Sequence, residues 1–207
     1  MTAADLRVAA LAAFSHEIRT PLTALRMIAD LATPAAGGGK LLDAELVAML
    51  SSSLDELHAL IDALQDQSRA ERGMLTAGDS RSTLAELLDF AVDAAREQGV
   101  SVVLISQIPA VEGPWDRERL GGALAAIAIG VDSLSCHRGE VQTEVLSSSE
   151  PGLAIFAPGR GEEVTDPLRP APFAFFAAIT VLEASGWQVD LDVGGDLCRC
   201  TLVPGGM

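Results

Sequence analysis

The residues in this 207-residue chain best suited to covalent chemistry are His16 and Glu17, which adjoin one another in a segment that reads FSHEIRTPL from residue 14 to 22. An imidazole nitrogen is a nucleophile. A neighbouring carboxylate that accepts the proton of the other ring nitrogen fixes the tautomer and makes the attacking nitrogen more basic. Pro21 follows within one turn and bends a helix, because its nitrogen carries no proton for the backbone hydrogen bond. The pattern therefore predicts a nucleophilic site on a bent helix.

This segment resembles the H-box of histidine kinases of the HisKA type, whose histidine accepts a phosphoryl group. The resemblance implies that His16 is the phospho-acceptor and Glu17 its acidic neighbour, while Arg19 holds phosphate oxygens. Thr20 completes a Glu-x-x-Thr pattern that accompanies phosphatase activity in the family, the hydroxyl orienting a water. Receiver domains of response regulators dock in the family on helix positions that correspond here to Thr23, Ala24, Met27, Ile28 and Leu31. Met27, Ile28 and Leu31 fit the core of a helical bundle equally well.

Two amphipathic helices are predicted to carry this motif, one over residues 3–32 and one over 41–72, because apolar residues recur in both at spacings of three and four. A Pro and Gly-rich stretch, 33–39, separates them and ends the first helix. One hairpin cannot bury both apolar stripes alone, whereas two copies can form a four-helix bundle. A homodimer is therefore expected.

A breaker-rich linker over residues 73–81 is followed by alternating helices and strands in the predicted order α-β-α-β-β-α-β-β. Thr83 and Glu86 have the spacing of a capping box that opens the first of these helices. The predicted fold class is α+β. A dimerisation and phosphotransfer hairpin spans residues 1–74, and an α/β sandwich resembling the Bergerat (ATPase-like) domain of histidine kinases spans 82–207.

The sequence departs from that family where the ATP-binding boxes should lie. The chain contains no asparagine, the residue with which the family holds magnesium and the triphosphate, and Gly130 occupies one such position. Ala157 stands where an aspartate should bind adenine, and Pro172 stands where a glycine amide should meet phosphate. The three phenylalanines that follow are expected to be closed off by packing or covered by a partner: Phe173, Phe175 and Phe176.

An intact phospho-acceptor half beside a degenerate nucleotide half resembles the ChpT-like histidine phosphotransferases of bacterial phosphorelays. This resemblance implies a homodimer that relays phosphoryl groups between receiver domains without ATP or a cofactor of its own, the receiver supplying Mg²⁺. It describes a pseudokinase rather than a kinase. An ATP-dependent histidine kinase, a non-catalytic adaptor that binds response regulators, and a phosphatase are the alternatives.

Charge, apolar stretches and cysteine count limit which partners and which cellular compartment are expected. The formal net charge of −15 counts against nucleic acid and against anionic membrane surfaces. The longest apolar stretches are about half the roughly 20 residues of a membrane span. The odd number of cysteines, three, favours a reducing cytoplasm over a disulfide framework. Cys198 and Cys200 share one face of a predicted strand, so buried thiols are expected rather than metal ligands.

Overall fold

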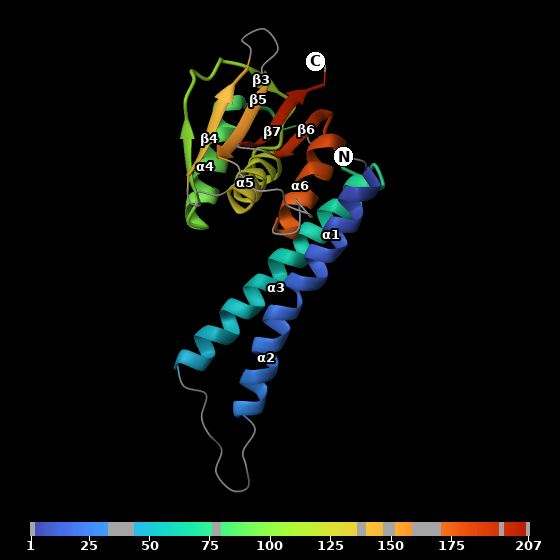
Figure 1. Cartoon of the computed structure of the whole chain (residues 1–207), viewed down its shortest axis with the longest axis vertical. Helices are drawn as coiled ribbons and strands as arrows, with labels where there is room; N and C mark the ends of the chain where they lie inside the picture. The colour runs from blue at the N-terminus through green and yellow to red at the C-terminus, as the bar shows by residue number, and fades with distance from the viewer. Residues whose placement is uncertain are drawn as a thin grey trace, which may run out of the picture.

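The computed structural model describes residues 3–32, 44–75, 80–135, 140–146, 152–158, 171–194 and 197–205. A long helical hairpin leads into an α/β domain, and the upper half of the hairpin lies against that domain (Figure 1). In the described ranges, no helix combines the length and the apolar character that crossing a membrane requires.

The first predicted helix is divided into α1 (Ala3–Glu17) and α2 (Arg19–Ala32), with Ile18 between them. The division has a local cause, since Pro21 has no N–H to donate to the carbonyl of Glu17 one turn earlier. Helical bonds on either side survive: the Ile18 amide donates to the Phe14 carbonyl and the Leu22 amide donates to the Ile18 carbonyl. The bend predicted from Pro21 thus lies within the H-box, two residues after His16.

The second long helix, α3 (Ala44–Glu71), returns beside α2, and its last residue, Glu71, pairs with Arg7 of α1. The first residues of the predicted helix, 41–43, lie outside the described residues. Four small or apolar residues of the hairpin are at most 9% exposed, namely Ala10, Ala13, Ile28 and Ala70, and the three alanines belong to the hydrophobic cluster shared with the α/β domain. An apolar stripe on α3 stays open, because Leu54, Ile61 and Leu64 are each at least 40% exposed in the single chain. This chain alone therefore leaves one apolar face of its hairpin uncovered.

The α/β domain follows the predicted order of helices and strands, with one addition. Its five-stranded sheet has the order β2-β4-β5-β7-β6, antiparallel except where β2 lies parallel to β4. The strands are β2 (Ser101–Leu104), β4 (Glu140–Val145), β5 (Leu153–Pro158), β6 (Trp187–Gly194) and β7 (Leu197–Pro204). Three helices pack on the sheet: α4 (Leu84–Glu97), α5 (Arg117–Leu134) and α6 (Phe173–Ala184). The addition is an antiparallel pair of two-residue strands, β1 (Ser82–Thr83) and β3 (Glu112–Gly113).

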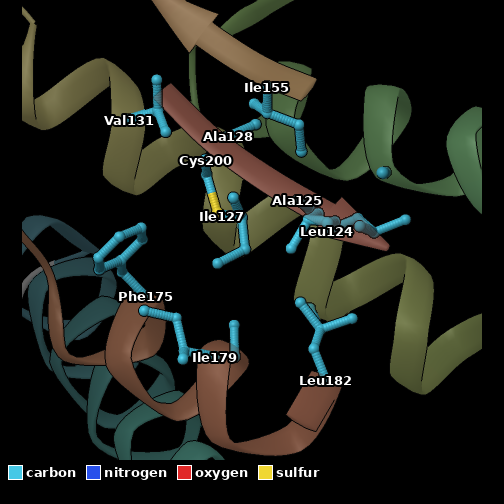
Figure 2. Packing of buried hydrophobic residues seen from close by; sticks show 14 of the residues in the cluster. Leu124, Ala125, Ile127, Ala128, Val131, Ile155, Phe175, Ile179, Leu182 and Cys200 are labelled. Atoms are coloured by element: carbon cyan, nitrogen blue, oxygen red, sulfur yellow. The ribbon is translucent and has the colours of Figure 1, made fainter. Parts of the chain in front are cut away.

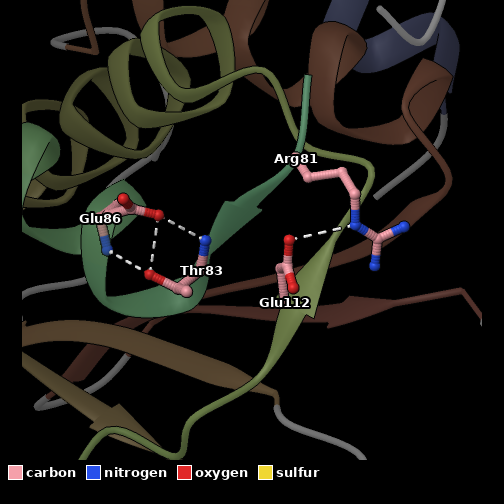
Figure 3. Close-up of polar contacts among 4 residues, drawn as sticks. All are labelled: Arg81, Thr83, Glu86 and Glu112. Atoms are coloured by element: carbon pink, nitrogen blue, oxygen red, sulfur yellow. Dashed lines mark hydrogen bonds and ion pairs between the residues drawn. The ribbon is translucent and has the colours of Figure 1, made fainter. Parts of the chain in front are cut away.

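The start of α4 is fixed by the predicted capping box (Figure 3). The Glu86 amide donates to Thr83 Oγ1 at 3.2 Å, and the Thr83 amide donates to Glu86 Oε2 at 2.7 Å. The Thr83 amide, and to a smaller extent the Thr83 hydroxyl, which donates to the same Glu86 Oε2, hold the pKa of the Glu86 carboxyl below its ordinary value. An ion pair joins Arg81, the residue before β1, to Glu112 of β3 beside the cap. The domain therefore begins at a well-defined point after the hairpin.

Helix α6 is mostly apolar and is largely covered by other elements. It lies between α5 and β6 on one side and α1 and α3 of the hairpin on the other. Eight of its twelve residues are buried. Figure 2 shows Phe175, Ile179 and Leu182 of α6 pointing toward Leu124 and Ile127 of α5. The hairpin and the α/β domain thus share a continuous hydrophobic core through α6.

Candidate phospho-acceptor site

The H-box residues lie at the junction of α1 and α2, where the helix bends. His16 is exposed in the last turn of α1, and Arg19 and Thr20 are exposed in the first turn of α2. Together with α3 they border an open groove of about 400 Å³. Its lining residues are His16, Arg19, Thr20, Thr23, Ala24, Met27 and Met49. A nucleophilic imidazole, a cation and a hydroxyl thus share one accessible surface.

This groove brings together most of the residues proposed from the sequence. Three predicted catalytic residues and three predicted docking residues line it, and Leu31 is exposed further along α2. The docking assignment needs a correction at Ile28, which is only 3% exposed on α2, a helix that packs mainly against α3. Met49 is an additional lining residue that sequence analysis missed, since only the packing of α3 beside α2 brings it there.

Glu17 is directed away from the groove. Its Oε1 accepts a hydrogen bond from the backbone N–H of Phe173, the first residue of α6, at 2.7 Å. Burial raises the pKa of the Glu17 carboxyl above its ordinary value, although the Phe173 amide and the nearby His16 act in the opposite direction. Within the part of the chain that the structure describes, no hydrogen bond joins Glu17 to the His16 imidazole. The predicted pairing of these neighbours is therefore not present in this arrangement.

The described residues that correspond to the nucleotide boxes lie among buried apolar side chains. Phe173, Phe175 and Phe176 are at most 3% exposed, so packing, the first of the two expected outcomes, closes this surface. A Cβ placed on Gly130 would lie 2.7 Å from the Phe175 Cβ, closer than real Cβ atoms approach. Ala157 is 1% exposed on β5, opposite Cys198 of β7.

The cysteines of the last strand are expected from the sequence to be buried thiols. In the described ranges, His, Cys, Asp and Glu form no group of three that would hold an ion. Cys198 and Cys200 are buried in the sheet, and burial raises the pKa of each thiol to about 12. They are packed thiols, as the strand pattern predicts.

A helical hairpin with an exposed histidine beside a proline bend, followed by an α/β sandwich, defines the architecture of the histidine kinase core. Residues 6–73 match the model of the His Kinase A (phospho-acceptor) domain. These residues thus match a HisKA domain, the kind of domain that carries a phospho-acceptor histidine in two-component signalling proteins, and His16 lies within the matched residues.

A curated sequence relative is a sensor protein. The chain is 35% identical over 89 residues to the sensor protein KdpD of Mycobacterium tuberculosis, a match that covers 42% of this chain and 10% of KdpD. The chain thus spans about a tenth of the length of the curated relatives it matches.

Solved structures share the fold across both domains. Histidine kinase AdeS of Acinetobacter baumannii superposes with a TM-score of 0.62 at 20% identity, covering 92% of this chain and 97% of AdeS. Full-length ShkA in complex with AMPPNP superposes with a TM-score of 0.56 at 18% identity, covering 100% of this chain and 47% of ShkA. The α+β fold predicted from the sequence is confirmed.

Proposed function

We propose that this chain is a histidine phosphotransferase, which relays phosphoryl groups between receiver domains of response regulators through His16 without binding ATP. The observation that carries the proposal is the packing of α6 against α5. Phe175 occupies the space beside Gly130, where the kinase family places an asparagine side chain that holds magnesium and the triphosphate. The acceptor histidine is accessible while this space is occupied by a phenyl ring.

The transfer itself needs a nucleophile and correct positioning. One ring nitrogen of His16 attacks the phosphorus of an aspartyl phosphate on the donor receiver. The N–P bond forms, the bond from phosphorus to the aspartate oxygen breaks, and the donor's carboxylate leaves. The other ring nitrogen keeps its proton. A second receiver then takes the phosphoryl group by the reverse chemistry, and each receiver supplies the Mg²⁺ at its own aspartate.

The groove supports a receiver as the partner. Arg19 is exposed beside His16 and can hold phosphoryl oxygens with its fork of N–H groups. Thr20 is exposed in the same groove and can orient a water, which would allow phosphatase activity to coexist with transfer. The groove continues along α2 through Thr23, Ala24 and Met27, a mainly apolar surface that a receiver can contact.

The proposed active form is a homodimer. Leu54, Ile61 and Leu64 repeat at intervals of seven and three along α3 and stay at least 40% exposed in the single chain. Such a stripe is the seam of a helical bundle, and a second copy of the hairpin would cover it. The negative charge of the chain and its exposed histidine agree with a protein partner rather than nucleic acid.

The test is phosphotransfer from receiver domains of the same cell, each labelled beforehand on its aspartate. The label should move to the parent protein and to His58→Gln, but not to His16→Gln. His58 is an exposed histidine on α3 outside the groove, so its replacement is the matched control. If no receiver labels the parent protein, the proposal fails, and a non-catalytic adaptor that binds response regulators becomes the better assignment. Glu17→Ala should slow transfer by about 10²-fold, as expected for an acid–base neighbour.

A further inference from the structure

The first residue of α6 is held at two points by the H-box face of α1. The rings of Phe14 and Phe173 meet edge to face with centroids 5.1 Å apart, and the Glu17 carboxylate accepts the Phe173 N–H. Phe14 and Glu17 are three residues apart and therefore lie on one face of α1. His16 projects instead into the groove on the other side. One short segment thus contacts the α/β domain and presents the acceptor histidine.

Glu17 performs the task of a helix cap for α6, across 156 residues of sequence. The first amides of any helix have no acceptor within the helix, and a negative charge is favoured at that end. Pro172, the residue before α6, makes no side-chain capping bond. The Glu17 carboxylate therefore satisfies a donor that local sequence leaves open. In return, this carboxylate is drawn away from the imidazole next to it.

We propose that Phe173 is a positioning residue whose N–H competes with the imidazole N–H of His16 for the Glu17 carboxylate. This inference rests on the proposed function and concerns its regulation. In the structure the Phe173 N–H donates to Glu17, so that Glu17 caps α6 and does not orient His16. We call this contact the latch, and the arrangement that contains it latched. Release from α6 lets Glu17 accept the ring proton, fix the imidazole tautomer and prepare the other nitrogen for attack. Movement of α6 is thereby coupled to the reactivity of His16.

The sharpest test deletes the amide proton and leaves Glu17 intact. Phe173→Pro removes the donor, and proline is well accepted at the first position of a helix. The preceding residue already has φ −69° and ψ 154°, a conformation compatible with a following proline. Phe173→Ala is the matched control, because it loses the same ring contact with Phe14 but keeps the N–H. Any difference between these two variants reports the bond to Glu17.

Two measurements on the full chain separate this inference from the proposed function. Nitrogen-15 NMR of the His16 ring should show one neutral tautomer enriched in Phe173→Pro relative to Phe173→Ala. Transfer from a phosphorylated receiver should be about tenfold faster in Phe173→Pro, the effect of roughly one hydrogen bond. Equal tautomer populations in the two variants would overturn the inference. A tautomer change with no label reaching His16 from any receiver would support the latch and contradict the phosphotransferase assignment.

A second comparison covers the case in which Phe173→Pro does not fold. Glu17→Gln keeps an oxygen that can accept the Phe173 N–H, whereas Glu17→Ala does not. Hydrogen exchange of the Phe173 amide should be about tenfold faster in Glu17→Ala than in Glu17→Gln, on the same hydrogen-bond scale. Equal exchange rates would show that Glu17 does not cap α6, and the proposal would fail.

Discussion

Adding a single methyl group at Gly130 tests whether the α5–α6 contact is as tight as the structure indicates. In Gly130→Ala the new Cβ would lie 2.7 Å from the Phe175 Cβ and closer still to its ring. Phe175 is fully buried, so the ring cannot swing into solvent. Overpacking of this kind costs about 1–3 kcal/mol. Alanine also has a better helix propensity than glycine, which stabilises the helix by about 0.5–1 kcal/mol and offsets part of this cost.

Gly122 offers a matched control in the same helix. A Cβ at Gly122 has no atom within 4 Å, so Gly122→Ala should stabilise the protein by about 0.5–1 kcal/mol. Because propensity contributes equally to both variants, the difference between them isolates the contact with Phe175. Gly130→Ala should be less stable than Gly122→Ala by about 1–3 kcal/mol. Urea unfolding followed by circular dichroism measures both free energies.

Making both glycine substitutions again in a Phe175→Ala background completes a double-mutant cycle. Removing the ring costs about 3–5 kcal/mol by itself and leaves space beside Gly130. In that background the added methyl group should no longer be unfavourable, so the two glycine variants should agree within about 0.5 kcal/mol. Equal stability of Gly130→Ala and Gly122→Ala in the parent background would refute the reasoning, since position 130 would then have room for a side chain.

Three further predictions concern the hairpin, the latch residue and the cysteines. Leu54→Asp should convert a dimer into monomers in light scattering, whereas substitution of Leu197, a similarly exposed leucine on β7, by aspartate should not. A monomeric parent protein would contradict the dimer. Because burial raises the pKa of Glu17, the parent should lose stability relative to Glu17→Gln as pH rises from the ordinary carboxyl range to neutral. If the difference between their urea midpoints is the same at both pH values, this prediction is wrong. Cys198 and Cys200, each with a pKa of about 12, should resist a thiol reagent at pH 8 until urea unfolds the chain, in a variant whose third cysteine is serine; rapid labelling of the folded protein would show them accessible.

Local signals in the sequence were sufficient for the order of helices and strands. The capping box at Thr83 and Glu86 opens α4 as predicted. The strands β1 and β3 were not predicted, because two residues each carry no readable alternation and their pairing joins segments about thirty residues apart. The bend next to His16 follows from Pro21, a purely local cause. The periodicity of apolar residues thus predicts the order of helices and strands, but it does not predict short strands that pair with distant segments.

The site itself was predictable only in part. The motif identifies His16 and its neighbours, but the partner of Glu17 lies 156 residues away and depends on how α6 packs against α1. The burial of Ile28 depends on which face of α2 meets α3, and the apolar pattern fits either face. Met49 reaches the groove for the same reason. Contacts across the hairpin and between domains are set by tertiary packing, which spacing within one segment does not encode.

The source of the phosphoryl group on His16 tests the central claim most directly. The protein is incubated in parallel with Mg²⁺ and γ-labelled ATP, and with the same cell's receiver domains labelled on their aspartates. His16→Gln serves as the control in both arms. We predict label on His16 from at least one receiver and none from ATP. Label on His16 from ATP alone would contradict this account and identify the chain as an active kinase.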